Sequence, residues 1–432
     1  MQHFIQKTLQ LKDKNILIDI DHLDDTLYKG QKSLMFYGKL TYHIKICSHC
    51  QTSGNIVKNG TRYLRITLAP FSGLPAYLCL SKQRFLCRHC HKSFTAKTSL
   101  VQPHCFISNP VIRMVCDRAT RTVSETDIAK DSFISIHSVR RIIDKMATKI
   151  SIRPTHALPE HLSFDEFKSV RSVKAAMSFS CMDTLSHKLV DIVHDRKQSS
   201  LRDYFIRYDY QARQQVKTVT IDMYEPYIHL IHRCFPKAKI IIDPFHLVQA
   251  LQRELNRLRV TVMNHYKNTD RPLYNKFKRY WKLLLKNDED LSFYPYKPYP
   301  LFKWQTHEQA IVDYLLDKDH QLRETYTVVN RLKYAIKHRQ WTMFETTLYQ
   351  SNILNISAGL NRVVRSFKKY QTYIQHTFQY PDLTNGPIEG FHNKVKVLKR
   401  NAYGYRNYWH FRHRILLMSR LYEPSIHQKI VA

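Results

Sequence analysis

Apolar residues follow different spacings in different parts of the chain, and these spacings predict its elements. Residues 1–40 mix apolar and charged positions without a recognisable motif. Strand-like alternation follows in RYLRITL and AYLCLSKQRF. Within residues 105–152, apolar positions recur at helical spacing in SIHSVRRIIDKMA, after a shorter helical stretch and a break near residues 132–135. This pattern predicts a helix-turn-helix.

From about residue 160 the pattern predicts a sheet. The strand-like runs LSFDEF, AAMSFSCMD and HKLVDIVHD come in succession, and VKTVTID and KAKIIID follow later. The helical stretch EPYIHLIHRCFP lies between the last two runs and stops at Pro236. Three strands followed by helix, strand, helix and strand predict a mixed sheet with crossover helices, in an RNase-H-like order.

Together these patterns predict a multidomain fold. We expect an N-terminal zinc ribbon plus helix-turn-helix, then an RNase-H-like mixed α/β sheet interrupted by an all-helical insertion. The expected regions are a lead-in at 1–40, the zinc ribbon at 41–100, the helix-turn-helix at 105–152, the first part of the sheet domain at 160–246, the insertion at 247–380 and the last helix of the sheet domain at 381–425.

The zinc ribbon is predicted from cysteine spacing. Two C-x-x-C pairs, in CSHC and CRHC, supply the four thiolates that a closed tetrahedral Zn²⁺ site needs. The predicted ligands are Cys47, Cys50, Cys87 and Cys90. Neighbouring histidines could replace a cysteine, namely His49, His89 and His91. The alternative is two pairs of ordinary buried thiols.

Composition points to a polyanionic partner. The chain has 68 Lys plus Arg against 35 Asp plus Glu, a formal net charge of +33, so nucleic acid is the expected partner and its binding should be salt-dependent. A basic chain that is merely soluble or ribosome-associated is the alternative. Only nine glycines occur, and none lies between Gly73 and Gly359, which excludes a phosphate-cradling loop and a nucleotide cofactor. We expect no membrane partner and a cytoplasmic, nucleoid-associated protein, since no apolar run or signal peptide is present.

Three acidic residues are the candidate catalytic groups. Asp165 lies inside LSFDEF, Asp222 closes VKTVTID, and Glu389 lies in the first turn of the helix that begins in NGPIEGF. Carboxylates are scarce in this basic chain, and two aspartates and a glutamate suffice to hold two Mg²⁺ (or Mn²⁺) ions beside a phosphodiester. Asp243, in DPFH, competes with Asp222 for the second place. The alternatives are a turn-capping role for Asp165 and a solvated basic face with one chance acid for Glu389.

Basic and polar residues at two places are the candidate DNA contacts. The second helix of the helix-turn-helix would enter a major groove with its exposed side. The helix of Glu389 turns an amide and cations toward one side. His246 would lie near the scissile phosphate, although a buried structural Asp-His pair is as plausible. The full set of predicted DNA-binding residues is His137, Ser138, Arg140, Arg141, His246, Asn393, Lys396, Lys399 and Arg400.

These motifs resemble one family over nearly the whole chain. The residues that carry the resemblance are CSHC with CRHC, SFDEF, VTIDMYEPY with FPKAKIIIDPFHLVQALQ, and NGPIEGFHNKVKVLKRNAYGYRNYWHFRHRILL. They are similar to the ISL-three family of insertion-sequence transposases, which are DDE enzymes of bacterial mobile elements. The resemblance implies an RNase-H-like core with a helical insertion, divalent-metal catalysis by Asp165, Asp222 and Glu389, recognition of terminal inverted repeats by the N-terminal modules, and a homo-oligomer on paired DNA ends.

The sequence thus predicts metal-dependent cleavage of double-stranded DNA at terminal inverted repeats and transfer of the strands to target DNA. A stand-alone metal-dependent nuclease is one alternative, and it would need no sequence-specific N-terminal reader. A DNA-binding regulator derived from a transposase is the other, and it would not depend on the three acids.

Overall fold

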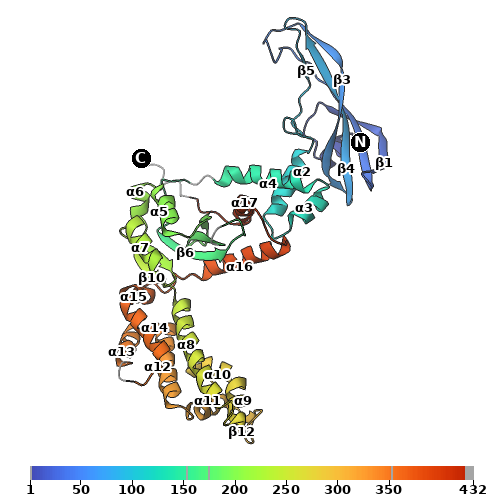
Figure 1. The fold of residues 1–432 in the computed structure, drawn as a ribbon. Helices are drawn as coiled ribbons and strands as arrows, with labels where there is room; N and C mark the ends of the chain where they lie inside the picture. The colour runs from blue at the N-terminus through green and yellow to red at the C-terminus, as the bar shows by residue number, and fades with distance from the viewer. Residues whose placement is uncertain (1, 152–153, 174–175, 352–353, 424–432) are drawn as a thin grey trace. The chain divides into compact units, whose positions relative to one another are not determined.

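A computed structural model describes residues 2–151, 154–173, 176–351 and 354–423 (Figure 1). By the contacts within it, the chain divides into two compact units. Unit 1 comprises residues 1–153, 170–172 and 393–420, and unit 2 comprises residues 154–169, 173–392 and 421–432. The predicted boundaries at 152 and 425, and Ala175 of the run AAMSFSCMD, lie outside the described residues. In the described part of the chain, every helix is too short or too polar to cross a membrane.

A five-stranded sheet forms the first part of unit 1. Its order is β1-β2-β4-β3, with β5 paired to β4; β2 and β4 are parallel and the other pairs antiparallel. The elements are α1 (Gln2–Thr8), β1 (Ile16–Tyr28), β2 (Gln31–Leu40), β3 (Ile56–Phe71), β4 (Leu74–Cys87) and β5 (Ser93–Thr95). The first forty residues, in which the sequence showed no motif, therefore supply two strands to the sheet that carries the cysteine pairs. Ile16, Leu40 and Leu78 are fully buried in its core.

Four helices form the second part of unit 1. They are α2 (Asn109–Ala119), α3 (Glu125–Ser132), α4 (Ile136–Ser151) and α17 (Tyr408–Met418). Ser124 caps α3 by accepting a hydrogen bond from the Asp127 backbone, and Phe133 ends it in the left-handed conformation, so a three-residue connection leads into α4. Buried Val139 and Ile143 of α4 pack in the shared apolar core.

The C-terminal helix α17 packs against α4 and α2, a grouping that the sequence did not predict. The guanidinium of Arg414 is fully buried and donates hydrogen bonds to the backbone carbonyls of Ala119, Arg121 and Val123, just after α2. A buried cation that satisfies three carbonyl groups holds the two segments firmly, because leaving those groups unpaired would be costly.

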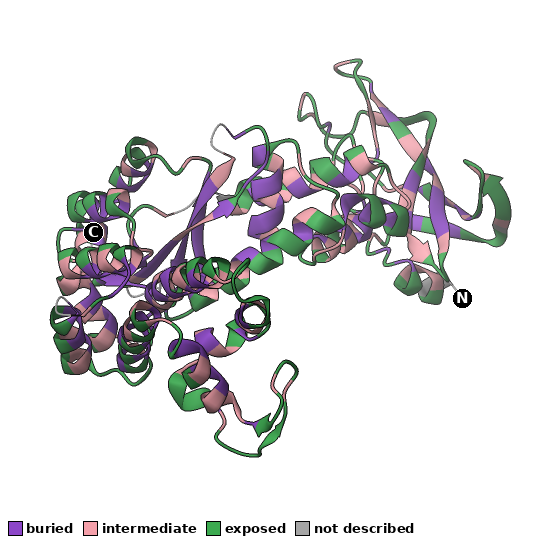
Figure 2. Cartoon of the chain, turned by 60° about the horizontal axis from the view of Figure 1, so that its bottom comes forward, coloured by how far each residue is buried: buried purple, intermediate pink, exposed green. Residues whose placement is uncertain are grey.

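Unit 2 contains a five-stranded sheet with the order β10-β9-β6-β7-β8. Its strands are β6 (His161–Lys168), β7 (Met177–Asp183), β8 (Leu189–Val193), β9 (Thr218–Ile221) and β10 (Lys239–Ile242). The first three strands form an antiparallel meander, whereas β9 pairs parallel with both β6 and β10. The strand β6 is central, and most residues of the five strands are buried (Figure 2).

Helices cover this sheet and extend into a helical region. They are α5 (Gln198–Ile206), α6 (Tyr210–Gln214), α7 (Glu225–Cys234), α8 (Pro244–His265), α9 (Arg271–Arg279), α10 (Trp281–Leu285), α11 (Glu308–Leu316), α12 (His320–Lys337), α13 (Trp341–Gln350), α14 (Ala358–Lys369), α15 (Gln371–Gln379) and α16 (Gly386–Asn401), with a 3-10 turn at Asp288–Asp290. One continuous apolar core runs from the sheet through these helices, from Leu158 to Ile374.

The prediction of an all-helical insertion is wrong in one detail. Two short strands, β11 (Lys297–Pro298) and β12 (Gln305–Thr306), pair antiparallel within it. The segment YPYKPYP explains the difference, because each proline removes a backbone donor and prevents a helix from continuing.

Candidate functional site

Strand register aligns three aspartates at one edge of the sheet in unit 2. Ser163 of β6 pairs with Thr220 of β9, so Asp165, on β6, and Asp222, directly after β9, each lie two residues beyond this pair. Ile221 pairs with Ile242 of β10, so Asp243, directly after β10, follows at the same level as Asp222. Side chains at the same level of adjacent parallel strands point to the same face, about 4.8 Å apart. The fold therefore gathers carboxylates that are far apart in the sequence.

Asp222 is more accessible to solvent than Asp243. Its side chain is 34% exposed, and its Oδ1 lies 2.8 Å from His246 Nε2 and 3.5 Å from the Asn385 amide nitrogen. The hydrogen bond to Asp222 raises the pKa of His246, burial opposes this shift, and the charges of Asp243 and Asp165 add to it. His246 was predicted as a contact near the scissile phosphate; in this structure its ring contacts the carboxylate.

Asp243 is buried, with 3% of its surface exposed. Its Oδ1 accepts a hydrogen bond of 3.1 Å from the Asn385 backbone N–H. Burial raises the pKa of Asp243 above its ordinary value, and the charges of Asp222 and Asp165 raise it further, against the Asn385 bond and the charge of His246. A buried carboxyl that already holds a backbone donor is poorly placed to bind a cation from solvent, so this geometry favours Asp222 as the second acid.

Asp165, on the central strand β6, is bound by His392 of α16. Its Oδ2 lies 3.1 Å from His392 Nδ1, and its Oδ1 accepts the backbone N–H of Glu166 at 2.6 Å. Glu166 has a separate, structural set of partners, since Tyr227 donates to its Oε1 at 2.6 Å and Arg196 to its Oε2 at 2.5 Å. The two neighbouring acids thus have different roles in the fold.

Asn385 links the start of α16 to the strand ends, and sequence reasoning did not single it out. It is 4% exposed, its backbone bonds Asp243, and its amide nitrogen donates to the Phe164 carbonyl at 3.2 Å as well as to Asp222. Its side-chain oxygen has no hydrogen-bond partner among the described residues. The motif NGPIEGF contained a signal, because the asparagine precedes the helix that carries Glu389.

Glu389 is exposed in the first turn of α16, where its backbone N–H bonds the Asn385 carbonyl at 3.0 Å. Among the described residues, the cysteine cluster is the one set of three or more potential ligands whose atoms already lie close enough to share an ion. The structure brings Asp165, Asp222 and Asp243 to one sheet edge, whereas joining Glu389 to them stays a prediction.

The carboxylates fit a divalent cation. Asp165 and Asp222 are partly exposed, at 21% and 34%, and the repulsion of each with Asp243 adds to burial, the main cause, in raising the pKa of Asp243. Oxygen ligands of this kind suit Mg²⁺ or Mn²⁺, and a bound cation would relieve the repulsion.

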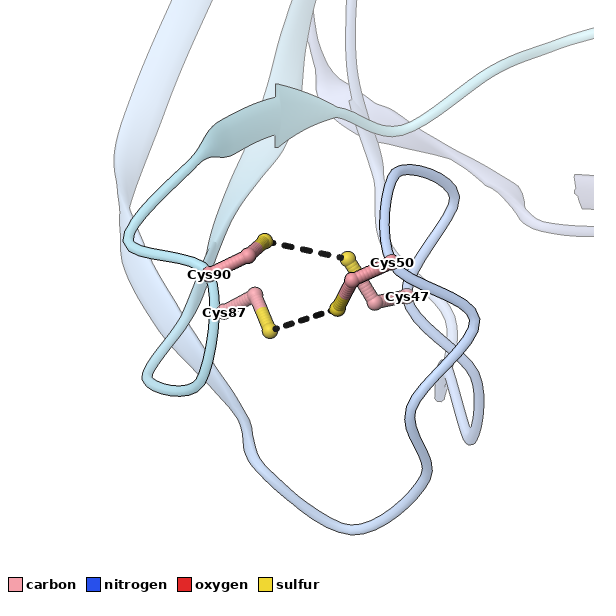
Figure 3. Close-up of side chains that lie close together, drawn as sticks. All are labelled: Cys47, Cys50, Cys87 and Cys90. Carbon is pink, nitrogen blue, oxygen red and sulfur yellow. Dashed lines mark hydrogen bonds between the residues drawn. The ribbon is translucent and has the colours of Figure 1, made fainter.

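The four predicted zinc ligands form one cluster at the end of the sheet in unit 1 (Figure 3). All four sulfur atoms lie within 4.8 Å of one another, with Cys47 Sγ 3.8 Å from Cys90 Sγ and Cys50 Sγ 3.7 Å from Cys87 Sγ. Four sulfurs bound at about 2.3 Å to one tetrahedral zinc lie about 3.8 Å apart, so the spacing fits Zn²⁺. The other five cysteines are free and lie outside this group.

The predicted DNA contacts of α4 differ in exposure. His137, Arg140 and Arg141 are exposed. The expectation that Ser138 lies on the exposed side is wrong: it is buried at 9%, and its hydroxyl pairs with the Ser135 hydroxyl at 3.0 Å and accepts from Arg141 at 3.2 Å. Ser138 lies in the first turn of α4, three residues after Ser135, and these local hydrogen bonds hold its hydroxyl against the preceding turn.

Three of the four predicted contacts on α16, Asn393, Lys396 and Arg400, are exposed on the helix side away from its packing residues. Lys399 is not on that side: it is half-buried, one turn after Val395, and its Nζ lies 5.8 Å from the centre of the Phe411 ring. Ile388, Val395 and Leu398 are buried on the other side. The helical spacing thus separated the two faces correctly, and the part these cations take in DNA binding stays a prediction.

A charged cluster in unit 1 joins α17 to the helices α3 and α4. His410 Nε2 lies 2.6 Å from Glu125 Oε1, and its Nδ1 lies 2.9 Å from Asp144 Oδ1, which His413 also contacts at 2.7 Å. Burial lowers the pKa of His410, but the bonds and charges of Glu125 and Asp144 outweigh this, so its pKa is raised above 6.5.

This cluster predicts that the helices of unit 1 lose stability at alkaline pH. Protonated His410 is favoured in the folded state, so its contribution is present below about pH 6.5 and is lost as the pH rises through its raised folded-state pKa. We expect hydrogen exchange in α3 and α4, corrected for intrinsic rates, to show less protection near pH 8.5 than near pH 6. A His410→Gln variant should lack this difference, and an equal difference in the variant would contradict the assignment.

Comparisons with known proteins identify a family and support the cysteine cluster as a zinc site. A family profile described as "Transposase", of the ISL3 type, matches residues 162–415. A second profile, described as "zinc-finger of transposase IS204/IS1001/IS1096/IS1165", matches residues 45–90. The chain therefore belongs to the ISL3 family of transposases, and its cysteine cluster is the zinc ribbon of that family.

Two relatives illustrate the similarity. The "Transposase for insertion sequence element IS1001" of Bordetella parapertussis is 26% identical over 390 residues, which are 88% of this chain and 90% of that protein. A protein of Lactococcus lactis subsp. lactis named "ATP-dependent protease" is 37% identical over 110 residues, 26% of this chain and 34% of that protein. The first similarity covers most of both chains, whereas the second covers too little of either chain to bear on function.

Proposed function

We propose that this chain is the transposase of a bacterial insertion sequence, and that it cleaves the ends of its element and joins them to target DNA with the help of two divalent cations. The observation that carries the proposal is the register that places Asp165 and Asp222 side by side on parallel strands. The strand order β10-β9-β6-β7-β8, with an antiparallel meander followed by two parallel strands, supports an RNase-H-like core.

Each residue of the proposed site has a defined task. Asp165 and Asp222 hold the cations, His246 and Asn385 orient Asp222, and Glu389 completes the site from the first turn of α16. Bound cations would neutralise the charge that develops on the attacking and leaving oxygens of the phosphodiester. The net charge of +33 favours the approach of the DNA phosphates to the rest of the chain.

Recognition of the element ends is assigned to unit 1. Its short helix α3, three-residue connection and α4 support a helix-turn-helix, with His137, Arg140 and Arg141 exposed on the second helix. We propose that these residues read terminal inverted repeats, that the zinc ribbon adds contacts, and that subunits assemble on paired ends.

The test uses the full-length protein and a plasmid that carries its reading frame with the flanking DNA. We expect footprints at inverted repeats on both sides of the frame, weaker at higher salt, and cleavage at their outer borders only when Mg²⁺ or Mn²⁺ is added. Cleavage without preference for the borders would favour a stand-alone nuclease. Footprints without cleavage or joining under any metal condition would favour a DNA-binding regulator.

A further inference from the structure

A buried hydrogen-bonded chain connects α16 to the central strand of unit 2. The His392 ring is 5% exposed, its Nδ1 lies 3.1 Å from Asp165 Oδ2, and its Nε2 lies 2.7 Å from the Ser180 hydroxyl. Ser180, on the neighbouring strand β7, is fully buried, and its hydroxyl oxygen also lies 3.1 Å from the Asp165 backbone carbonyl oxygen. Both nitrogens of the ring are thus engaged by the same strand pair.

These contacts fix the direction of the carboxylate. An ionised carboxylate only accepts hydrogen bonds, so Nδ1 of His392 is the donor to Asp165. Because the opposite nitrogen is tied to Ser180, the ring cannot turn away without breaking both bonds. Oδ2 of Asp165 therefore keeps one orientation.

The second aspartate has a similar arrangement. Asp222 Oδ1 is bound by His246, from the first turn of α8, and by the Asn385 amide. The two partly exposed acids at the sheet edge each have one histidine donor from a different helix. Donors that orient ligating carboxylates in this way tune both the geometry and the affinity of a metal site.

His392 also fastens the helix that carries Glu389. It lies one turn after Glu389 on α16, and Asn385 fixes the start of the same helix to the strand ends. The Phe167 ring lies beside the His392 ring, and the buried residues Ile388 and Val395 are close to His392 along α16. An apolar side chain at position 392 could pack against them without the cost of burying two polar nitrogens. Hydrogen bonding therefore explains a histidine at this position better than packing does.

We propose that His392 is a positioning residue, which orients the Asp165 carboxylate for a divalent cation and couples that orientation to the placement of α16. The inference rests on the proposed function, because it assigns Asp165 to the cation site. Ser180 completes the arrangement by holding the far side of the ring.

The experiment measures Mn²⁺ binding to the full-length, zinc-loaded protein by electron paramagnetic resonance, together with Mn²⁺-dependent cleavage of the plasmid described above. In His392→Leu we expect the dissociation constant for Asp165-dependent Mn²⁺ binding to rise by about 10- to 100-fold. In His392→Asn the amide nitrogen can replace Nδ1, so the constant should stay near that of the wild type. Ser180→Ala should weaken binding less than His392→Leu.

The matched control is His376→Gln, which disturbs another half-buried histidine of unit 2, one whose Nδ1 lies 2.7 Å from the Ile240 carbonyl. It should leave Mn²⁺ binding unchanged. If His392→Leu binds Mn²⁺ as the wild type does while its melting temperature falls, or if His392→Asn loses as much affinity as His392→Leu, the proposal is overturned. If His392→Leu does not fold, the proposal is tested by the dissociation constants of His392→Asn and Ser180→Ala for Mn²⁺. Normal Mn²⁺ binding without any DNA cleavage would instead refute the proposed function alone.

Discussion

Replacing Asp165 or Asp222 by asparagine is expected to reduce metal-dependent cleavage at the element ends to background, while binding to the same DNA persists. Each substitution removes one negative charge from a partly exposed carboxylate at the sheet edge and keeps its size. An amide holds a divalent cation far more weakly than a carboxylate does, and in the proposed mechanism two cations stabilise the displacement. Cleavage is measured on plasmid DNA and binding by footprinting.

The matched control is Asp243→Asn. Asp243 is buried on the next strand, its pKa is raised by burial, and an asparagine oxygen could still accept the Asn385 N–H. This variant should therefore retain most of the cleavage activity. The opposite result, with Asp243→Asn inactive and Asp222→Asn active, would exchange the roles of the two acids. Unchanged cleavage in Asp165→Asn would remove Asp165 from the site.

Removing zinc is expected to have the second largest effect, confined to the sheet of unit 1. The four cysteine sulfurs are spaced for one tetrahedral ion, and in small zinc domains the apparent binding free energy is about 10–16 kcal/mol. Strong chelation, or a Cys87→Ser substitution, should release one zinc per chain and abolish footprints at the element ends. Metal analysis and circular dichroism follow the loss.

Cys116→Ser is the control, since this thiol lies in α2 and outside the cluster. It should retain one zinc and normal footprints. Full retention of zinc in Cys87→Ser would show that Cys87 is not a ligand. Loss of DNA cleavage with intact footprints in that variant would place the ribbon outside end recognition.

The parts of the fold that follow local rules were predictable from the sequence. Cysteine spacing gave the zinc ribbon because a metal with four thiolate ligands restricts the spacing tightly. The β-branched runs TVTI and KIII gave the strands β9 and β10, because such residues favour buried parallel strands. By contrast, β1 and β2 were not predicted, since their mixed charges leave much of each strand in solvent and weaken the alternation.

For the candidate site, residue type and position relative to a strand end led to Asp165 and Asp222, and their role in binding cations stays a prediction. Asp243 stayed a competitor of Asp222 because both follow a buried strand, and the difference in their burial is visible only in three dimensions. Asn385 and His392 were missed because their importance lies in bonds to strands about 140 to 220 residues away in the sequence. No periodicity encodes such contacts.

The engagement of α17 by the N-terminal helices has a consequence for experiments on fragments of the chain. Arg414 and His410 supply bonds that the segments after α2 and within α3 and α4 need, although they come much later in the sequence. A fragment that stops before α17 lacks these bonds, and its helix group is incomplete. We therefore expect α2, α3 and α4, expressed without α17, to be less stable than the same helices in the full chain.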